Sequence, residues 1–455
     1  MANAGQMVDV KVNGSHAYQA IDGFGVNVNS RYWNQGRLVP TMDLLREDLG
    51  ATLYRVDIWG KSNWVDPAGT IGPAALNEEN YAAIYGGDVF RRGWAMMRYL
   101  NEHGLEPYLT ASGDVPPWML GPDGKTLAQY DMFCDMLVSM VEWARRKEHL
   151  RFTLFGPLNE TDVGSPEGPR VMPAEFGKVL EVLDAKLSQQ GLDDVRLVVA
   201  EQSAFSTDYL REIVRSERLA RRIGVIGMHT YADLPRDRYQ EVLSLVRSGP
   251  CAGCRLWMTE YGDLEQSGER EWYVAWAMTS RLFDLLEGGF QGALVWDAYD
   301  NYHDHGEAWT IYGLLRTGLR VYTPKKRYYA SRQAFRFVQP GFERLETSSA
   351  SPDLRVLAFA SPDRTQFTLV GMNRSSCKHY YLNVRLEGFP GQVTGGQVAY
   401  YRTTETENCH RIGVLPASGP NWPFTGIDAA VPPDSIFTLT NTEETGFLHN
   451  ARRKT

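Results

Sequence analysis

The chain has 455 residues, which is long enough for one large domain and a smaller one. Its 43% hydrophobic and 22% charged residues argue against extended disorder, and the 55 acidic residues against 47 basic ones argue against a nucleic-acid partner. No apolar run reaches the roughly 18–20 residues that span a bilayer, so no membrane partner is predicted.

The first residues lack the apolar core of a signal peptide. As it stands, the chain is therefore expected in the cytoplasm, whereas a leader removed from the natural protein would make it a secreted one. The sequence leaves the oligomeric state open.

The chain begins with an amphipathic strand. Val8, Val10 and Val12 alternate with polar residues, and Asn13-Gly14 predicts a turn directly after them. This pattern is typical of a half-buried antiparallel strand, which needs partners elsewhere in the chain.

From residue 21 onward, apolar strands alternate with helical segments, as in βα units. Apolar residues at helical spacing predict helices around residues 130–144, from Pro173 to Gly191, and from Trp272 to Gly288. Eight strands are predicted, at residues 24–28, 53–58, 107–111, 152–158, 195–200, 225–229, 256–259 and 293–296. This alternation predicts an α/β fold with a (β/α)8 TIM barrel over residues 21–338.

After Gln339-Pro340-Gly341 the pattern changes to short strands separated by turn residues, which predicts a C-terminal β-sandwich. Its predicted strands are residues 354–360, 366–371, 380–386, 397–401 and 435–440. The sandwich offers partners to the N-terminal strand, so residues 1–20 and 339–442 are expected to form one β domain. Residues 443–455 are polar and predict a frayed tail.

Two glutamates stand at the ends of predicted barrel strands. Asn159-Glu160 follows the fourth strand and Glu260 the seventh, and the carboxyl ends of barrel strands open into one cleft. Retaining glycoside hydrolysis needs such a pair about 5–5.5 Å apart, in which one carboxyl protonates the leaving oxygen and the other attacks the anomeric carbon. The alternative for either glutamate alone is a solvated loop residue.

An Asn-Glu after the fourth strand and a Glu after the seventh resemble the pattern of clan A glycoside hydrolases, which are retaining (β/α)8 enzymes. Further segments resemble glycoside hydrolase family 30: residues 21–25 at the first strand, 112–119 after the third, and His229-Thr230-Tyr231 after the sixth. The shared C-terminal β-sandwich adds to this resemblance, which spans nearly the whole chain in architecture but only short islands in sequence.

The resemblance implies that Glu160 is the acid/base and Glu260 the nucleophile of a β-glycosidase. An acid must hold its proton at rest, so the pKa of Glu160 must be raised. Asn159 is implied to bind the sugar 2-hydroxyl. His229 and Tyr231 are implied to orient Glu260 by hydrogen bonds, although a strand-end histidine is often only a satisfied polar residue.

Arg55, on the second strand, is expected to pair with Glu260 and keep it ionised, with a purely structural ion pair as the alternative. Trp118 and Trp296, after the third and eighth strands, are candidate stacking platforms for a sugar, with caps of the barrel as the alternative. Further candidate ligands of sugar hydroxyls are Asp57, Asp114, Glu201 and Asp297.

Two motifs resemble metal sites, but we interpret one as a turn and the other as part of a substrate loop. Cys251 and Cys254 form a CxxC, but no second ligand pair with comparable spacing exists, so a turn before a strand is preferred. His303 and His305 flank one aspartate without a fixed third ligand, in a region expected to form a substrate loop. We therefore expect neither a metal nor a cofactor, because the catalytic groups are side chains.

The expected partner is a carbohydrate substrate, but the sugar and its linkage stay open. The segment 60–87 is long enough to wall off one end of the cleft, which would favour exo action. Two alternatives to hydrolysis are a transglycosylase with the same covalent intermediate and a non-catalytic carbohydrate-binding protein on the same barrel.

Overall fold

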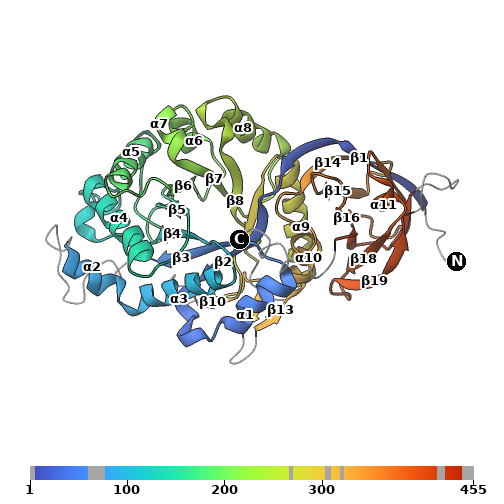
Figure 1. The fold of residues 1–455 in the computed structure, drawn as a ribbon, viewed down its shortest axis with the longest axis horizontal. Helices are drawn as coiled ribbons and strands as arrows, with labels where there is room; N and C mark the ends of the chain where they lie inside the picture. Colours follow the sequence, from blue (N-terminus) through green and yellow to red (C-terminus); the bar gives the residue numbers. More distant parts are fainter. Residues whose placement is uncertain are drawn as a thin grey trace.

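The computed structural model describes residues 6–59, 77–265, 270–302, 309–317, 322–417 and 426–442. Figure 1 shows a barrel of strands and helices beside a second domain made of strands. Most of the segment 60–87, His303, His305 and the tail from residue 443 lie outside the described residues, so the expectations placed there are not tested.

Eight parallel strands form a closed barrel and follow one another in chain order. The last strand pairs with the first and closes it. The strands are β2 (Gly23–Asn29), β3 (Leu53–Trp59), β4 (Tyr108–Ser112), β5 (Leu154–Gly156), β6 (Arg196–Ala200), β7 (Ile223–Thr230), β8 (Arg255–Tyr261) and β9 (Gly292–Val295). Each lies on a predicted run, which confirms the (β/α)8 barrel.

The strand that leads to Glu160 is shorter than predicted. β5 has only three residues and ends at Gly156, because the next residue, Pro157, has no N–H to donate to the sheet. The chain therefore leaves the barrel early and places Asn159 and Glu160 on the loop above it.

Helices surround the barrel, as Figure 1 shows. They are α1 (Val39–Asp43), α2 (Glu78–Tyr85), α3 (Asp88–Glu102), α4 (Tyr130–Arg146), α5 (Pro173–Gln189), α6 (Asp208–Ile213), α7 (Glu217–Arg222), α8 (Arg236–Arg247), α9 (Glu271–Glu287) and α10 (Lys326–Phe335). In α4, the predicted stripe of Phe133, Leu137 and Val141 is buried against the core. Among the described residues, no helix has both the length and the apolar character that crossing a membrane requires.

Short elements connect the barrel units. The helical turns are η1 (Ser30–Tyr32), η2 (Asn34–Gly36), η3 (Leu44–Leu49), η6 (Pro117–Met119) and η7 (Pro250–Gly253). After β9, two small hairpins pair β10 (Asn301–Tyr302) with β11 (Trp309–Thr310) and β12 (Leu315–Thr317) with β13 (Tyr322–Pro324).

The second domain is a nine-stranded, mostly antiparallel sheet in the order β19-β18-β21-β16-β15-β14-β1-β17-β20. A bridge between Ala417 and Ile427 joins its two ends, so the sheet curls into a sandwich around its own apolar core. The elements are β1 (Gln6–Ala20), β14 (Glu343–Ser349), β15 (Leu354–Ala360), β16 (Phe367–Asn373), β17 (Tyr380–Glu387), α11 (Gly391–Thr394), β18 (Gln397–Thr403), β19 (His410–Pro416), β20 (Ile427–Val431) and β21 (Ser435–Thr440). The N-terminal strand β1 lies between β14 and β17 and so belongs to this sheet.

The turn predicted at Asn13-Gly14 is wrong. β1 continues through both residues to Ala20, with register shifts against β14 that accommodate the extra residues. Asn13 donates a 2.9 Å hydrogen bond to Glu346 on β14. Pairing with distant strands thus overrides the local turn preference. The strand is also not purely antiparallel, because it pairs in parallel with β17.

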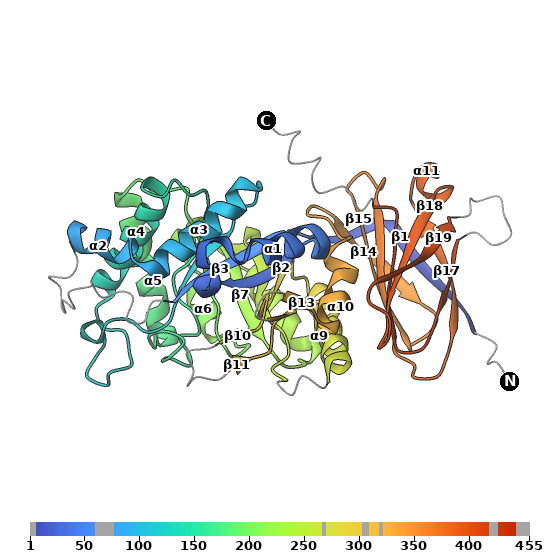
Figure 2. The ribbon, with the colours of Figure 1, turned by 90° about the horizontal axis from the view of Figure 1, so that it is seen from below.

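The barrel and the β domain meet along α9 and α10, which lie between them in Figure 2. Arg355 on β15 donates to Asp284 at 2.6 Å and to Glu287 at 3.0 Å, both on α9. Gln333 on α10 donates to Thr403 on β18 at 2.8 Å. The β domain therefore braces the helix that follows the strand of Glu260.

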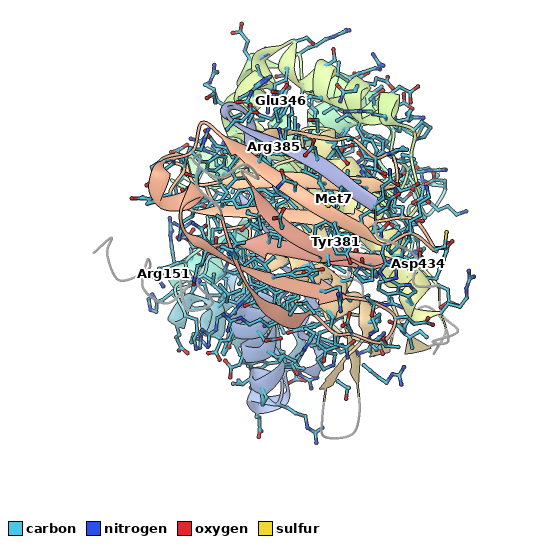
Figure 3. All side chains as sticks on the ribbon, turned by 90° about the vertical axis from the view of Figure 1, so that its right-hand side faces the viewer. Met7, Arg151, Glu346, Tyr381, Arg385 and Asp434 are labelled. Atoms are coloured by element: carbon cyan, nitrogen blue, oxygen red, sulfur yellow. The ribbon has the colours of Figure 1, made fainter. Side chains whose placement is uncertain are left out.

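The outer face of the sandwich, seen in Figure 3, has a mixed character. Met7 and Tyr381 are paired on β1 and β17 and are exposed by 61% and 48%. Nearby, Arg385 pairs with Asp9 at 3.0 Å. Charged side chains therefore lie among the apolar ones in the described part of this face.

Candidate active site

The candidate site residues come from four barrel strands and meet at the carboxyl ends of those strands. In a (β/α)8 barrel this end carries the loops that form the cleft. The fold brings together Arg55 of β3, Asn159 and Glu160 after β5, His229 of β7, Tyr231 after β7, and Glu260 of β8.

Glu160 and Glu260 lie close together around His229. One oxygen of Glu160, one ring nitrogen of His229 and one oxygen of Glu260 all lie within 4.8 Å of one another. The Glu260 side chain is 5% exposed and that of Glu160 12%, so the pair is enclosed and Glu160 is its more accessible member.

The backbone of Glu160 has an unusual conformation, with a φ of 45°. Its N–H donates to the carbonyl of Glu201 at 2.9 Å, and its own carbonyl accepts from the N–H of Val163 at 3.0 Å. A non-glycine residue in this left-handed region costs about 1–3 kcal/mol, and such strain is concentrated at functional sites.

Arg55 is the buried cation at the centre of the site, with a side chain that is 1% exposed. It donates from Nη1 to Glu260 and, at 3.0 Å, to Asn27. It donates from Nη2 to Asn159 at 2.6 Å. Arg55 therefore contacts Glu260 as expected, and it also contacts the residue next to Glu160.

Tyr231 and His229 divide their hydrogen bonds between the two glutamates. The Tyr231 hydroxyl donates to Glu260. The Nδ1 atom of His229 lies 2.9 Å from Glu160 and 3.6 Å from Glu260. The expectation that His229 orients Glu260 by a hydrogen bond is therefore wrong, because the nearer carboxylate is that of Glu160.

The surroundings of Glu160 and His229 raise the pKa of both groups. Burial raises the pKa of Glu160; the hydrogen bond with His229 opposes this shift, and the charge of Glu260 adds to it. Burial would lower the pKa of His229, but the carboxylates of Glu260, Glu160 and Glu201 outweigh it and raise that pKa to about 10. A carboxyl group with a raised pKa is what a general acid requires.

Two further carboxyl groups lie near this pair. Asp57 of β3 accepts a hydrogen bond from Ser112, and burial raises its pKa to about 6 against the opposing effect of Arg55. Glu167, on the loop after β5, was not predicted from the sequence. Burial and the charges of Glu160, Glu260 and Asp57 raise its pKa to about 8.

The position of Glu167 follows from its backbone. Its carbonyl accepts a 2.7 Å hydrogen bond from the N–H of Gly113, which directly follows β4. Its N–H donates to Gly164 at 3.0 Å, so the loop after Glu160 turns back towards β4. In the sequence, Glu167 has no apolar pattern around it and is indistinguishable from a solvated loop residue.

The other predicted ligands are Trp118, Trp296, Asp114 and Asp297. Trp118, in η6, is half-buried and packs against the barrel core, and Trp296 directly follows β9. The Asp114 carboxylate accepts a 3.0 Å hydrogen bond from Ser165 on the loop after β5. Asp297 is 2% exposed. Sugar-binding roles for these residues stay predictions.

Glu201 is more deeply buried than the other predicted ligands, and its role as a ligand of sugar hydroxyls stays a prediction. It is 1% exposed, and its carboxylate lies beside Arg55 and His229. The sequence could place Glu201 at the end of a strand, but it could not show whether that end opens to the cleft or is covered.

The two cysteines of the CxxC motif are free thiols. They lie in and directly after η7, which precedes β8. This is the amino end of the strand, whereas Glu260 lies near its carboxyl end. The motif therefore forms a turn at the opposite end of the barrel from the candidate site.

The fold is similar to that of several solved structures. A glycoside hydrolase family 30 subfamily 8 xylanase from Clostridium acetobutylicum has a TM-score of 0.71 and 17% identity, covering 95% of this chain and 99% of its own. A family 30 endoxylanase from Clostridium papyrosolvens has a TM-score of 0.70 and 18% identity, covering 96% and 100%. An endo-β-1,6-glucanase has a TM-score of 0.66 and 15% identity, covering 97% and 96%.

No protein-family model matches the chain. At these sequence identities the structural likeness establishes the fold alone. That fold, a closed (β/α)8 barrel with a β-sandwich that also takes in the N-terminal strand β1, is the one predicted from the sequence. The chain has a fold like that of glycoside hydrolase family 30 enzymes.

Proposed function

We propose that the protein is a retaining β-glycosidase in which Glu260 is the nucleophile and Glu160 the acid/base. The observation that carries this proposal is their separation, since an oxygen of each lies within 4.8 Å of the other. Retaining enzymes hold the two carboxyl groups about 5–5.5 Å apart, whereas inverting enzymes hold them about 6.5–9.5 Å apart to admit a water molecule.

In the first step, a carboxylate oxygen of Glu260 attacks the anomeric carbon from the face opposite the leaving group. The bond between that carbon and the leaving oxygen breaks, and the proton of Glu160 passes to this oxygen. The aglycone departs as a neutral alcohol. The sugar stays bound to Glu260 as an ester of α configuration.

In the second step, ionised Glu160 takes a proton from a water molecule, whose oxygen attacks the anomeric carbon. The ester bond to Glu260 breaks, and Glu260 recovers its negative charge. Glu160 is protonated again, and the released sugar has the β configuration of the substrate.

The neighbouring residues support this change of role. The charge of Glu260 raises the pKa of Glu160 in the resting site. Once Glu260 is esterified, that charge is gone, so the pKa of Glu160 falls and suits a base. Asn159 is held by Arg55 through its amide oxygen, which leaves its amide nitrogen as the group to donate to the sugar 2-hydroxyl.

We propose a β-linked glycoside or oligosaccharide as the substrate. Similar structures are described as xylanases and an endo-β-1,6-glucanase, so xylo- and gluco-configured substrates come first in a panel. Galacto- and fuco-configured aryl β-glycosides complete it. Sizing the products of xylan and β-1,6-glucan would distinguish release of single sugars from cleavage within the chain.

The Glu260→Ala variant tests the proposed function. It should lose nearly all turnover of an aryl β-glycoside and recover part of it with added azide, which then attacks the anomeric carbon in place of the carboxylate. The expected product is an α-glycosyl azide. A β-glycosyl azide, or full activity without azide, would contradict the assignment of Glu260. The Cys251→Ala variant, at the opposite end of β8, should keep wild-type turnover.

A further inference from the structure

Glu201 is joined to the catalytic region through its backbone. It directly follows β6, and its N–H donates to the carbonyl of Gly227 on β7 at 3.0 Å. Its carbonyl accepts from the N–H of Glu160 at 2.9 Å. The position of Glu201 is therefore fixed between the strand of His229 and the acid/base residue.

The carboxylate of Glu201 contacts the two buried cations of the site. Its Oε1 atom lies 3.5 Å from Nε of Arg55 and 3.9 Å from Nε2 of His229, and it accepts a 3.0 Å hydrogen bond from Tyr108. Arg55 uses a different nitrogen for Glu260, and His229 a different one for Glu160. Each cation therefore lies between Glu201 on one side and a catalytic glutamate on the other.

The neighbouring strands leave room for this side chain. A Cβ atom at Gly156 of β5 would lie 2.8 Å from Oε2 of Glu201, and one at Gly227 of β7 would lie 2.9 Å from its Cγ. Both distances are shorter than real contacts of a Cβ atom. The two glycines thus allow the buried carboxylate to reach Arg55 and His229.

We propose that Glu201 is a positioning residue that keeps His229 charged and Glu160 protonated by balancing one of the two buried cations. Glu201 lies against both Arg55 and His229, so its negative charge offsets positive charge beside Glu160 and favours the protonated acid. This inference rests on the proposed function, because it presumes that Glu160 is the acid.

The groups that face Glu201 come from all the strands around it. Arg55 belongs to β3, Tyr108 to β4 and His229 to β7, while Glu160 and Glu260 lie beyond them. Burial raises the pKa of Tyr108 far above its usual range, so Tyr108 is a neutral donor. Burial would also raise the pKa of Glu201, but Arg55, His229 and Tyr108 outweigh it and lower that pKa.

Removing the charge of Glu201 should lower the pH at which the Glu160–His229 pair releases a proton. With Glu201 neutral, the cluster has one more net positive charge, so the Glu160–His229 pair releases its next proton at lower pH. This holds whichever of the two residues releases that proton, because the titration belongs to the pair. Asp57 has a pKa of about 6, which is lower than the pH range in which the Glu160–His229 pair is expected to release this proton, so the two titrations can be told apart.

The first test needs no substrate. Ring-nitrogen signals of His229 are followed by NMR across pH in the full-length wild type and in Glu201→Gln, with His229→Gln used to assign them. The apparent pKa of the pair should fall by about one unit or more in Glu201→Gln. Glu201→Asp keeps the charge but withdraws it from the cations, and its shift should be smaller and of the same sign. An unchanged titration in both variants would overturn the proposal.

Circular dichroism shows whether each variant is folded, and Glu201→Asp provides the test if Glu201→Gln does not fold. The second test compares kcat/KM on aryl β-glycosides with poor and good leaving groups. In the pH profile of kcat/KM, the alkaline limb is the fall in activity at high pH. Glu201→Gln should move this limb to lower pH for the substrate with the poor leaving group, and much less for the substrate with the good one. A merely structural role would lower both profiles without moving either limb.

The outcomes separate this inference from the proposed function. If the wild type hydrolyses no glycoside, the proposed function fails, while the His229 titration still decides the role of Glu201. If the wild type has the same alkaline limb on both substrates, the acid role of Glu160 fails. If only the Glu201 variants leave the limb and the titration unmoved, this inference alone is overturned.

Discussion

Arg55 and Asn159 are joined by a 2.6 Å hydrogen bond from the guanidinium Nη2 to the amide Oδ1. The neighbouring Nη1 of the same group donates to Glu260. Because a guanidinium is planar and rigid, it fixes the directions of both bonds at once. One side chain therefore sets the position of the proposed nucleophile relative to the residue beside the proposed acid.

We predict that Arg55→Lys stays folded and loses most of its activity. A lysine keeps the charge but is a single point donor, so it cannot hold Glu260 and Asn159 in the same plane. The kcat on an aryl β-glycoside should fall by about 100-fold or more, with a smaller change in KM. Arg98→Lys, at an exposed arginine that donates to Glu148 at 2.9 Å, is the control and should match the wild type. A kcat of Arg55→Lys within a few-fold of wild type would contradict the role given to Arg55.

The Glu160→Ala variant should discriminate between substrates by their leaving groups. A nitrophenolate needs little protonation as it departs, so its release should be spared, whereas a simple alkyl glycoside should lose activity by about 100-fold or more. Added azide should yield a β-glycosyl azide, because it enters after the sugar is already bound to Glu260. Equal losses on both substrates would argue against an acid/base role for Glu160.

Much of the fold follows from local sequence signals. Eight apolar runs predicted eight barrel strands because each strand is covered on both faces and must be apolar throughout. The β domain was predicted less completely. β14, β19 and β20 were missed. Charged residues such as Glu343, Arg344 and Arg411 interrupt the alternation in the first two, and β20 has only five residues. The turn at Asn13-Gly14 failed because two distant strands hold β1 in an extended conformation.

The candidate site was also predicted only in part, because local sequence signals mark some of its residues and contacts between distant strands position the others. Glu160 and Glu260 could be recognised because Glu160 follows an apolar strand and Glu260 lies near the end of another, and strand ends converge in a barrel. Glu201 also ends such a strand, yet its buried position depends on the missing side chains of Gly156 and Gly227, which lie on two other strands. The hydrogen bond of His229 to Glu160 depends on side-chain geometry, which no spacing in the sequence records.

The raised pKa of Glu167 can be tested by measuring how the free energy of unfolding depends on pH. Its folded pKa of about 8 lies above the usual value of 4.5 because of burial and neighbouring carboxylates. Below about pH 4.5 the group is protonated in both states, and between about pH 4.5 and 8 only the unfolded chain releases the proton, so stability falls as pH rises. Glu167→Gln removes this loss. Relative to wild type, its free energy of unfolding should rise by roughly 2–4 kcal/mol between about pH 5 and 8.

Urea denaturation at several pH values measures this difference, with Asp123→Asn as the control. Hydrogen bonds from Thr126 and Lys125 lower the pKa of Asp123 to about 2, so its contribution is lost only in stronger acid. The difference between Asp123→Asn and wild type should therefore be constant over the range in which Glu167→Gln changes. A constant difference for Glu167→Gln as well would show that its carboxyl is ionised throughout.

Arg281 joins the loops that follow the strands of His229 and Glu260. This residue of α9 is 5% exposed and donates to the Gly262 carbonyl at 2.7 Å and to Asp263 at 2.8 Å, just after β8. It also donates to Asp233 at 2.8 Å, on the loop after β7. A single cation thus fixes the chain on both sides of the contact between Tyr231 and Glu260.

We predict that Arg281→Ala lowers both stability and kcat, because the Gly262 carbonyl and Oδ2 of Asp263 both lose the guanidinium that donates to them. The cost should be about 3–5 kcal/mol of unfolding free energy, and kcat should fall by about 10-fold at a temperature where the variant is fully folded. Arg218→Ala removes an exposed partner of Asp184, at 2.8 Å, and should change both quantities little. Arg281→Lys should recover part of the stability and less of the kcat, since one donor cannot hold both loops. If Arg281→Ala kept wild-type kcat once folded, the hydrogen bonds of Arg281 would stabilise the fold without affecting the site. The positions of Tyr231 and Glu260 would then be set by their strands alone.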